Sequence, residues 1–116
     1  MAQDLSHFHA PVSEIFARVT AENAATWRLT NEQVAFYREH GYLPGVRVLT
    51  DEQVEVLRTE LNAFFQPDHD GHELWYEYHS NESADPGTVL FHALGAWRIG
   101  AGFHDLLWNP AFTVPA

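Results

Sequence analysis

The sequence predicts an α+β fold that is rich in helix. Two segments begin with the same helix-start signal, at Thr30 and at Thr50, and apolar residues follow each signal at helical spacing. Two later segments, 74–78 and 88–94, are rich in aromatic and apolar residues and are separated by turn-forming residues. Helices together with one strand pair indicate the α+β class.

Residues 1–28 are predicted to form a leader that contains one short helix. Pro11 and Ser13 are suitable helix-start residues. Apolar residues then follow at helical spacing, namely Ile15, Phe16 and Val19. Alanines dominate the next stretch, so we expect this leader to pack loosely.

Residues 29–116 are predicted to form the domain proper, which opens with two capped helices. In each helix a Thr precedes a Gln by three residues, as in a capping box. The first helix is expected over about 31–40, because Gly41 is suited to a left-handed cap. The second is expected from 51 to Pro67, which ends it. Its apolar face comprises Val54, Leu57, Leu61, Phe64 and Phe65.

The second half of the chain is predicted to hold a hairpin and a third helix. The strands 74–78 and 88–94 can pair across the loop 81–87. A helix is expected over about 97–108, closed by Asn109 and Pro110. Its apolar side comprises Ile99, Phe103, Leu106 and Leu107. The uncharged segment 111–116 is typical of chain that enters another element.

Composition excludes several classes of function. The chain has 16 Asp and Glu against 6 Arg, no Lys and no Cys, and its formal net charge is −10. Such an acidic chain is a poor partner for nucleic acid or for an anionic membrane. Without Cys and Lys there are no disulfides, thiolate metal sites or Schiff bases. No targeting segment or membrane span is recognisable, and we therefore expect a cytoplasmic protein.

One acidic loop invites a metal-site interpretation. Its sequence is Asp68-His69-Asp70-Gly71-His72-Glu73, which offers five possible ligands. The spacing fits neither a calcium loop nor a zinc site. We therefore interpret the loop as a solvated connection, and a metal-binding regulator is the least favoured function.

Two histidines invite a comparison of functional and structural roles. His104 and Asp105 are adjacent on the predicted third helix, where neighbours diverge by about 100°. We interpret them as a pair on the helix surface. His92 lies on the strand 88–94, with its side chain on the same face as Leu90 and Leu94. A role in the core is favoured for it, and a role in a pocket is the alternative.

No iron-binding facial triad is encoded. Such a triad begins with His-x-Asp or His-x-Glu on a strand, because residues two apart share a face. None of the eight His in the sequence is followed two positions later by Asp or Glu. No glycine-rich phosphate loop or nucleophile elbow occurs either. Catalytic residues are therefore not predicted in this chain.

The order of the elements resembles the opening of the phytanoyl-CoA dioxygenase family. The residues that carry this resemblance are L-T-N-E-Q-V-A-F-Y-R-E-H-G-Y-L (29–43) and L-T-D-E-Q-V-E-V-L-R-T-E-L (49–61). The later strand 88–94 and the segment F-H-D-L-L-W-N-P (103–110) are also similar to what precedes the catalytic core in that family. The resemblance spans about residues 29–116.

The resemblance implies a non-haem Fe(II)- and 2-oxoglutarate-dependent oxygenase on a double-stranded β-helix, a jelly-roll or cupin-like fold. Fe(II) and 2-oxoglutarate are then the cofactors of the full-length enzyme, which hydroxylates a small organic substrate. The triad and the 2-oxoglutarate-binding Arg lie downstream, so this chain matches only the N-terminal helices and first strands. Its main partner is the missing C-terminal core. His92 is where the resemblance places a contact to 2-oxoglutarate.

A stand-alone acidic protein-interaction module without catalysis is the alternative hypothesis. Such a module is expected to close its own core. An N-terminal part of a larger enzyme is expected to leave an apolar face open on the third helix and the strand 88–94. Alone, that part should not turn over substrate.

Overall fold

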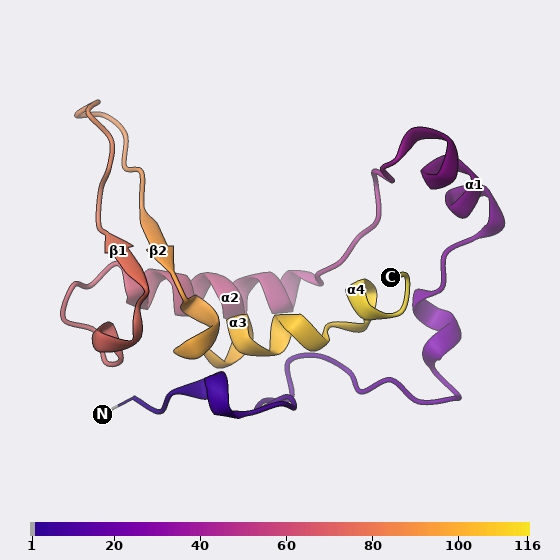
Figure 1. Cartoon of the computed structure of the whole chain (residues 1–116), viewed down its shortest axis with the longest axis horizontal. Coiled ribbons are helices and arrows are strands. Elements are labelled where there is room, and N and C mark those ends of the chain that lie inside the picture. Colours follow the sequence, from indigo (N-terminus) through magenta and orange to yellow (C-terminus); the bar gives the residue numbers. More distant parts are fainter. Residues whose placement is uncertain (1) are drawn as a thin grey trace.

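The computed structural model describes residues 2–116 and shows a small α+β fold (Figure 1). Helices α2 (Asp51–Phe64) and α3 (Ala101–Asp105) lie side by side along the long axis. A two-stranded hairpin projects from one end, and α1 (Asn31–His40) stands at the other. The N-terminal segment runs along the side of α3 that faces away from α2. The α+β prediction is thereby confirmed at this level.

Both capping boxes are present. The hydroxyl of Thr30 accepts from the Gln33 N–H at 3.1 Å, and the Gln33 side chain accepts from the Thr30 N–H at 2.8 Å. Thr50 and Gln53 repeat this arrangement at the start of α2. Gly41 ends α1 with a φ of +80°, a conformation that glycine adopts without a Cβ clash. The predicted bounds of α1 are confirmed, whereas α2 begins as predicted but ends at Phe64, before Pro67.

Helix α2 supplies the centre of the core. Its Leu57 and Phe64 are buried, as the apolar spacing predicted. The Phe64 ring contacts Trp75 edge-on at 5.0 Å and Phe103 at 5.9 Å between centroids. Leu61, however, lies partly in solvent, so the buried face is narrower than the predicted one.

The hairpin pairs as predicted, but with shorter strands. β1 (Glu77–His79) runs antiparallel to β2 (His92–Leu94), with Tyr78 opposite Ala93. Leu74, the first residue of the predicted strand, instead ends a 3₁₀ turn (His72–Leu74) that follows Gly71. Residues 88–91 lie outside the ladder. The Asn81 side chain accepts from the Leu90 N–H at 2.9 Å, in place of a strand partner, while the Leu90 carbonyl still accepts from the Glu82 N–H at 2.8 Å.

The predicted third helix over 97–108 is wrong as a single element. It is divided into a 3₁₀ turn (Ala96–Arg98), α3, and a second 3₁₀ turn (Leu106–Trp108). The break before α3 follows from Glu60, whose carboxylate accepts from the Gly102 N–H at 2.8 Å and starts a new helix there. Pro110 disfavours helix at Asn109, and α4 (Pro110–Thr113) then begins with Asn109 as its cap.

The short helix predicted in the leader is also wrong. Residues 11–19 contain no helix, and the helical turns of this part are at Leu5–His7 and Ala24–Trp27. The polar groups of the segment bind other elements instead of one another. Ser13 binds Asp105, and the Ile15 carbonyl accepts from the Gln53 amide at 3.0 Å. Phe16 is buried, so the segment is part of the core.

The buried core is small for the length of the chain. Among residues 2–116 the buried apolar side chains are Leu5, Phe16, Leu57 and Phe64. The radius of gyration is 17.1 Å. A compact chain of this length is expected to have about 13 Å. The molecule is therefore open, and large apolar side chains stay in contact with solvent.

Candidate functional site

His92, the one cofactor contact predicted from the sequence, lies on the exposed hairpin. Its Nε2 is 3.6 Å from Glu77 and its Nδ1 is 3.5 Å from Glu82. The ring of His79, the residue opposite on β1, lies 5.7 Å away between centroids. The His92 side chain is 42% exposed. The structure thus brings two imidazoles and two carboxylates together on one face of the hairpin.

The charges of this hairpin cluster are coupled. His79 Nε2 is 2.9 Å from Glu77 Oε1. This hydrogen bond, followed by the charge of His92, lowers the pKa of Glu77 below its ordinary value. Glu77 therefore remains ionised next to His92 at neutral pH.

The acidic loop 68–73 is tied down by hydrogen bonds. The Trp75 indole N–H donates to His69 Nε2 at 2.7 Å, and His69 Nδ1 faces the Asp70 carbonyl at 2.9 Å. Asp70 accepts from the Ala2 N–H at 2.9 Å. Across the part of the chain that the structure describes, no three His, Asp or Glu side chains are grouped so that they could hold a metal ion.

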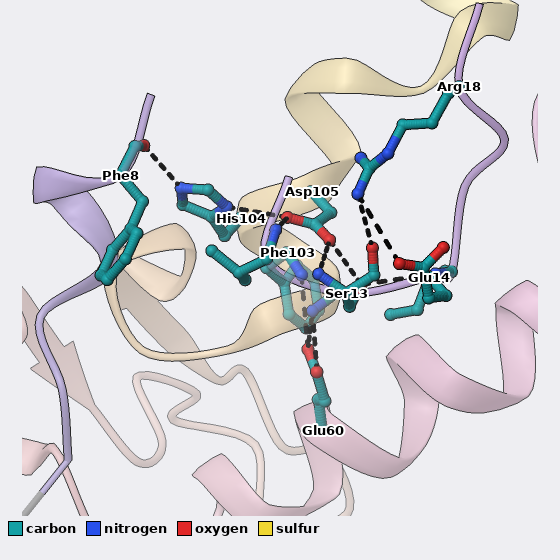
Figure 2. A network of polar contacts seen from close by, with 11 residues as sticks. Phe8, Ser13, Glu14, Arg18, Glu60, Phe103, His104 and Asp105 are labelled. Atoms are coloured by element: carbon teal, nitrogen blue, oxygen red, sulfur yellow. Dashed lines mark hydrogen bonds and ion pairs between the residues drawn. The ribbon is translucent and has the colours of Figure 1, made fainter. Parts of the chain in front are cut away.

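The most completely buried polar side chains belong to a hydrogen-bond network around α3 (Figure 2). The sequence did not predict this network. His104 and Asp105 are 0% and 1% exposed. The Asp105 carboxylate accepts from the Val12 N–H at 2.8 Å, the Ser13 N–H at 2.7 Å and the Ser13 hydroxyl. His104 Nδ1 lies 2.9 Å from Asp105 Oδ1, and His104 Nε2 lies 3.0 Å from the Phe8 carbonyl.

The interpretation of His104 and Asp105 as a surface pair is therefore wrong. Helix α3 is only five residues long, and the N-terminal segment covers its last turn. The side chains of His104 and Asp105 contact each other at that covered end, although neighbouring residues on a helix usually point in different directions. One signal was available: the pair stands between Phe103 and Leu106 in an otherwise apolar run.

Asp105 is ionised in spite of its burial. Burial alone would raise its pKa, but hydrogen bonds from Ser13, His104 and the Val12 amide outweigh burial. The pKa of Asp105 consequently lies below the ordinary value.

The three residues Ser13, Asp105 and His104 do not form a catalytic triad. The Ser13 hydroxyl binds the carboxylate rather than the imidazole, and His104 Nε2 faces a backbone carbonyl. In a triad the imidazole stands between the nucleophile and the acid. Because the carboxylate here stands between the other two and all are covered, the network connects the N-terminal segment to α3.

A second network fixes α3 against α2. Both oxygens of the Glu60 carboxylate accept from the Gly102 N–H, at 2.8 and 3.0 Å, and one also accepts from the Phe103 N–H at 3.3 Å. A Cβ on Gly102 would lie 2.9 Å from Glu60 and 2.9 Å from Leu57. Glycine is needed there because α2 and α3 approach closely.

The N-terminal segment is bound at a third place. Arg98 donates to the Asp4 carboxylate at 2.5 and 3.3 Å and to the Leu74 carbonyl at 2.9 Å. Its guanidinium lies 4.7 Å from the centre of the Tyr76 ring. The hydrogen bond from Arg98 is the main cause that lowers the pKa of Asp4 far below its ordinary value.

An apolar cavity lies between α1 and the C-terminal residues. It has a volume of about 630 Å³ and is lined mainly by apolar side chains, among them Leu29, Tyr37, Leu43, Val46, Val48 and Phe112. A cavity of about 340 Å³ next to it is lined by Trp27, Arg47 and Asn109. His92 lines neither of these two cavities.

Comparison with family models, with curated proteins and with solved structures found no match for this chain. Within residues 2–116 no helix has both the length and the apolar character that a membrane span requires.

Proposed function

We propose that this chain is the N-terminal part of a non-haem Fe(II)/2-oxoglutarate-dependent dioxygenase of the phytanoyl-CoA dioxygenase type. In this role it buttresses a β-rich catalytic core that it does not itself contain, and the complete enzyme hydroxylates a small organic substrate. The sequence resemblance over residues 29–116 supports the proposal. The order of the elements also supports it: a Gly-capped helix, an amphipathic helix, a hairpin and a short helix.

The observation that carries the proposal is the open apolar surface of the hairpin. More than half of the surface of each of four large side chains is exposed there, namely Tyr76, Val89, Leu90 and Leu94. Exposed apolar surface of this extent is typical of a face that another part of the protein covers. A closed, independent module was expected to bury these residues.

The small size of the sheet also supports the proposal. It has two strands of three residues each. An isolated pair of strands is marginally stable in water and needs further strands or a packed layer. We propose that β1 and β2 are the first strands of a double-stranded β-helix whose remaining strands extend this sheet and cover its exposed apolar side chains.

The residues of this chain do not fit the iron. A facial triad needs two His and one carboxylate converging on one point. Residues 2–116 offer no such group. In the proposal the iron ligands are therefore supplied by the core, which is the main partner of this segment.

His92 is also a poor fit to 2-oxoglutarate in the arrangement described. Glu77 and Glu82 flank its imidazole at 3.6 and 3.5 Å, and their charges repel a dianion. A contact between His92 and the co-substrate stays a prediction that requires the core to displace these glutamates. His92→Ala in the complete enzyme tests it, through the KM for 2-oxoglutarate.

The first experiment is to sequence the source transcript beyond the codon for Ala116. We expect an in-frame continuation that encodes His-x-Asp, a later His and an Arg. Expression of that longer chain should then give 2-oxoglutarate-dependent succinate formation. A stop codon at this point would contradict the proposal and favour the acidic interaction module, which would use the same apolar surface to bind another protein.

A variant pair tests the role of the surface in the longer chain. Leu90→Asp places a charge on the proposed core contact and should abolish succinate formation. Val19→Asp is the matched control, because Val19 is an exposed apolar residue on the N-terminal segment. Equal activity of the two variants would show that the hairpin surface does not contact the core.

A further inference from the structure

The buried imidazole of His104 faces an acceptor at each of its nitrogens. Nδ1 lies 2.9 Å from the Asp105 carboxylate and Nε2 lies 3.0 Å from the Phe8 carbonyl oxygen. A neutral imidazole carries one N–H and donates to one acceptor only. Its second nitrogen would then direct a lone pair at a buried oxygen. The ring satisfies both neighbours only when both nitrogens carry protons.

The surroundings of Asp105 require a positive charge nearby. Its carboxylate accepts two backbone N–H groups and the Ser13 hydroxyl, which is a set of partners suited to the ionised form. A buried carboxylate is stable only when a counter-charge pairs with it. Arg18, the arginine labelled in Figure 2, is directed to the Ser13 carbonyl and to Glu14 instead. The imidazole is the remaining candidate in this network.

A third contact also favours a cation at His104. The indole ring of Trp108 stacks on the imidazole, with 4.9 Å between centroids and 29° between the planes. The face of an indole ring attracts a cation. This stacking is independent of the hydrogen bonds at the two nitrogens.

We propose that His104 carries a proton on both ring nitrogens in the folded protein, and that this imidazolium is a proton-dependent latch that holds residues 8–13 on α3. Loss of one proton removes the imidazole N–H from either the Phe8 carbonyl or the Asp105 carboxylate, and it leaves the buried carboxylate without a counter-charge. The segment then opens. The other ionisable groups of the network are Glu60 on α2, held by the Gly102 and Phe103 amides, and the outer pair Glu14 and Arg18.

The first test measures the protonation of His104 directly in the unaltered chain. Long-range ¹H–¹⁵N NMR at pH 7.5 should show both ring nitrogens of His104 in the protonated range. The exposed imidazole of His9, recorded in the same spectrum, serves as the internal comparison. A single neutral tautomer at His104 would overturn the proposal.

The second test measures the latch. Hydrogen exchange of the Val12 and Ser13 amides, corrected for intrinsic rates, is compared at pH 6 and pH 9. We expect protection to fall at least tenfold at pH 9, while amides inside α2 keep theirs. In the variant His104→Gln the side chain at position 104 cannot be charged, so protection of the Val12 and Ser13 amides should be low at both pH values. Equal protection of the unaltered chain at pH 6 and pH 9 would rule the latch out.

Discussion

The Ser13 N–H donates to the Asp105 carboxylate at 2.7 Å, across 92 positions of sequence. This bond, with those from Val12 and from the Ser13 hydroxyl, makes the N-terminal segment a structural part of the domain. The stability of the segment and of α3 should therefore depend on one carboxylate.

Replacing Asp105 by Asn tests this dependence. The substitution would leave His104 without its charged partner and would turn an amide N–H toward backbone donors. Removing one partner of a buried pair costs about 3–5 kcal/mol, and we expect a loss in this range by urea denaturation. Asp51→Asn is the matched control: Asp51 pairs with Arg47 in solvent, and its loss should cost less than about 1 kcal/mol. Similar losses in the two variants would contradict the central role of Asp105.

Acid should destabilise the fold through the same carboxylate. The pKa values of Asp105 and Asp4 are lower in the folded chain than in the unfolded one. Their contribution is present above the unfolded value of about 3.9 and is lost as the pH falls below it toward the folded pKa. Urea midpoints measured from pH 6 to pH 2.5 should fall most steeply below about pH 4. The slope should become shallower in Asp105→Asn.

The contribution of the α2 capping box to the stability of the fold should be measurable with a single substitution. Thr50→Ala removes the hydroxyl that accepts from the Gln53 N–H, and a lost N-cap costs about 1 kcal/mol. Thr59→Ala is the matched control, because the Thr59 hydroxyl binds a carbonyl within the same helix and lies on its exposed side. Thermal denaturation followed by circular dichroism compares them. A larger loss in Thr59→Ala would refute the assigned cap.

The close approach of α2 and α3 predicts that a side chain at Gly102 displaces the ends of the Glu60 and Leu57 side chains. In Gly102→Ala the new Cβ would meet Glu60 and Leu57 at 2.9 Å, and overpacking of this kind costs about 1–3 kcal/mol. Gly87→Ala should be nearly neutral, since the nearest atom to its Cβ would be 3.5 Å away. Chemical denaturation distinguishes the two variants, and equal stability would place α3 farther from α2.

Capping residues in the sequence predicted the helix ends that are set by hydrogen bonds between residues close in sequence. Thr30, Thr50 and Gly41 act through hydrogen bonds within a few residues, and the helix boundaries that they set were predicted correctly; the end of α2, which no such cap marks, was placed too late. The pairing of the hairpin was also predicted. Its strand lengths were not, because Asn81 replaces a ladder partner with its side chain.

Long-range contacts explain what the sequence did not show. Glu60 is 42 positions from Gly102 and still decides where α3 begins. The segment 11–19 satisfies the rules for a helix start, yet its donors are taken by Asp105 from the far end of the chain. Burial of His104 follows from that same contact. His92 is exposed in this chain. In the proposal, its final surroundings are supplied by the catalytic core, which local sequence signals cannot describe.

The bond between Ser13 and Asp105 has a consequence for biosynthesis. A ribosome that adds about 5–20 residues per second needs roughly 5–20 s to make the intervening chain. During that time Leu5 and Phe16, both buried in the finished fold, belong to a chain in which α3 has not yet been made. The N-terminal segment therefore takes its final position only after α3 has been synthesised. Until then, this early part of the nascent chain is a target for a chaperone that binds short apolar segments.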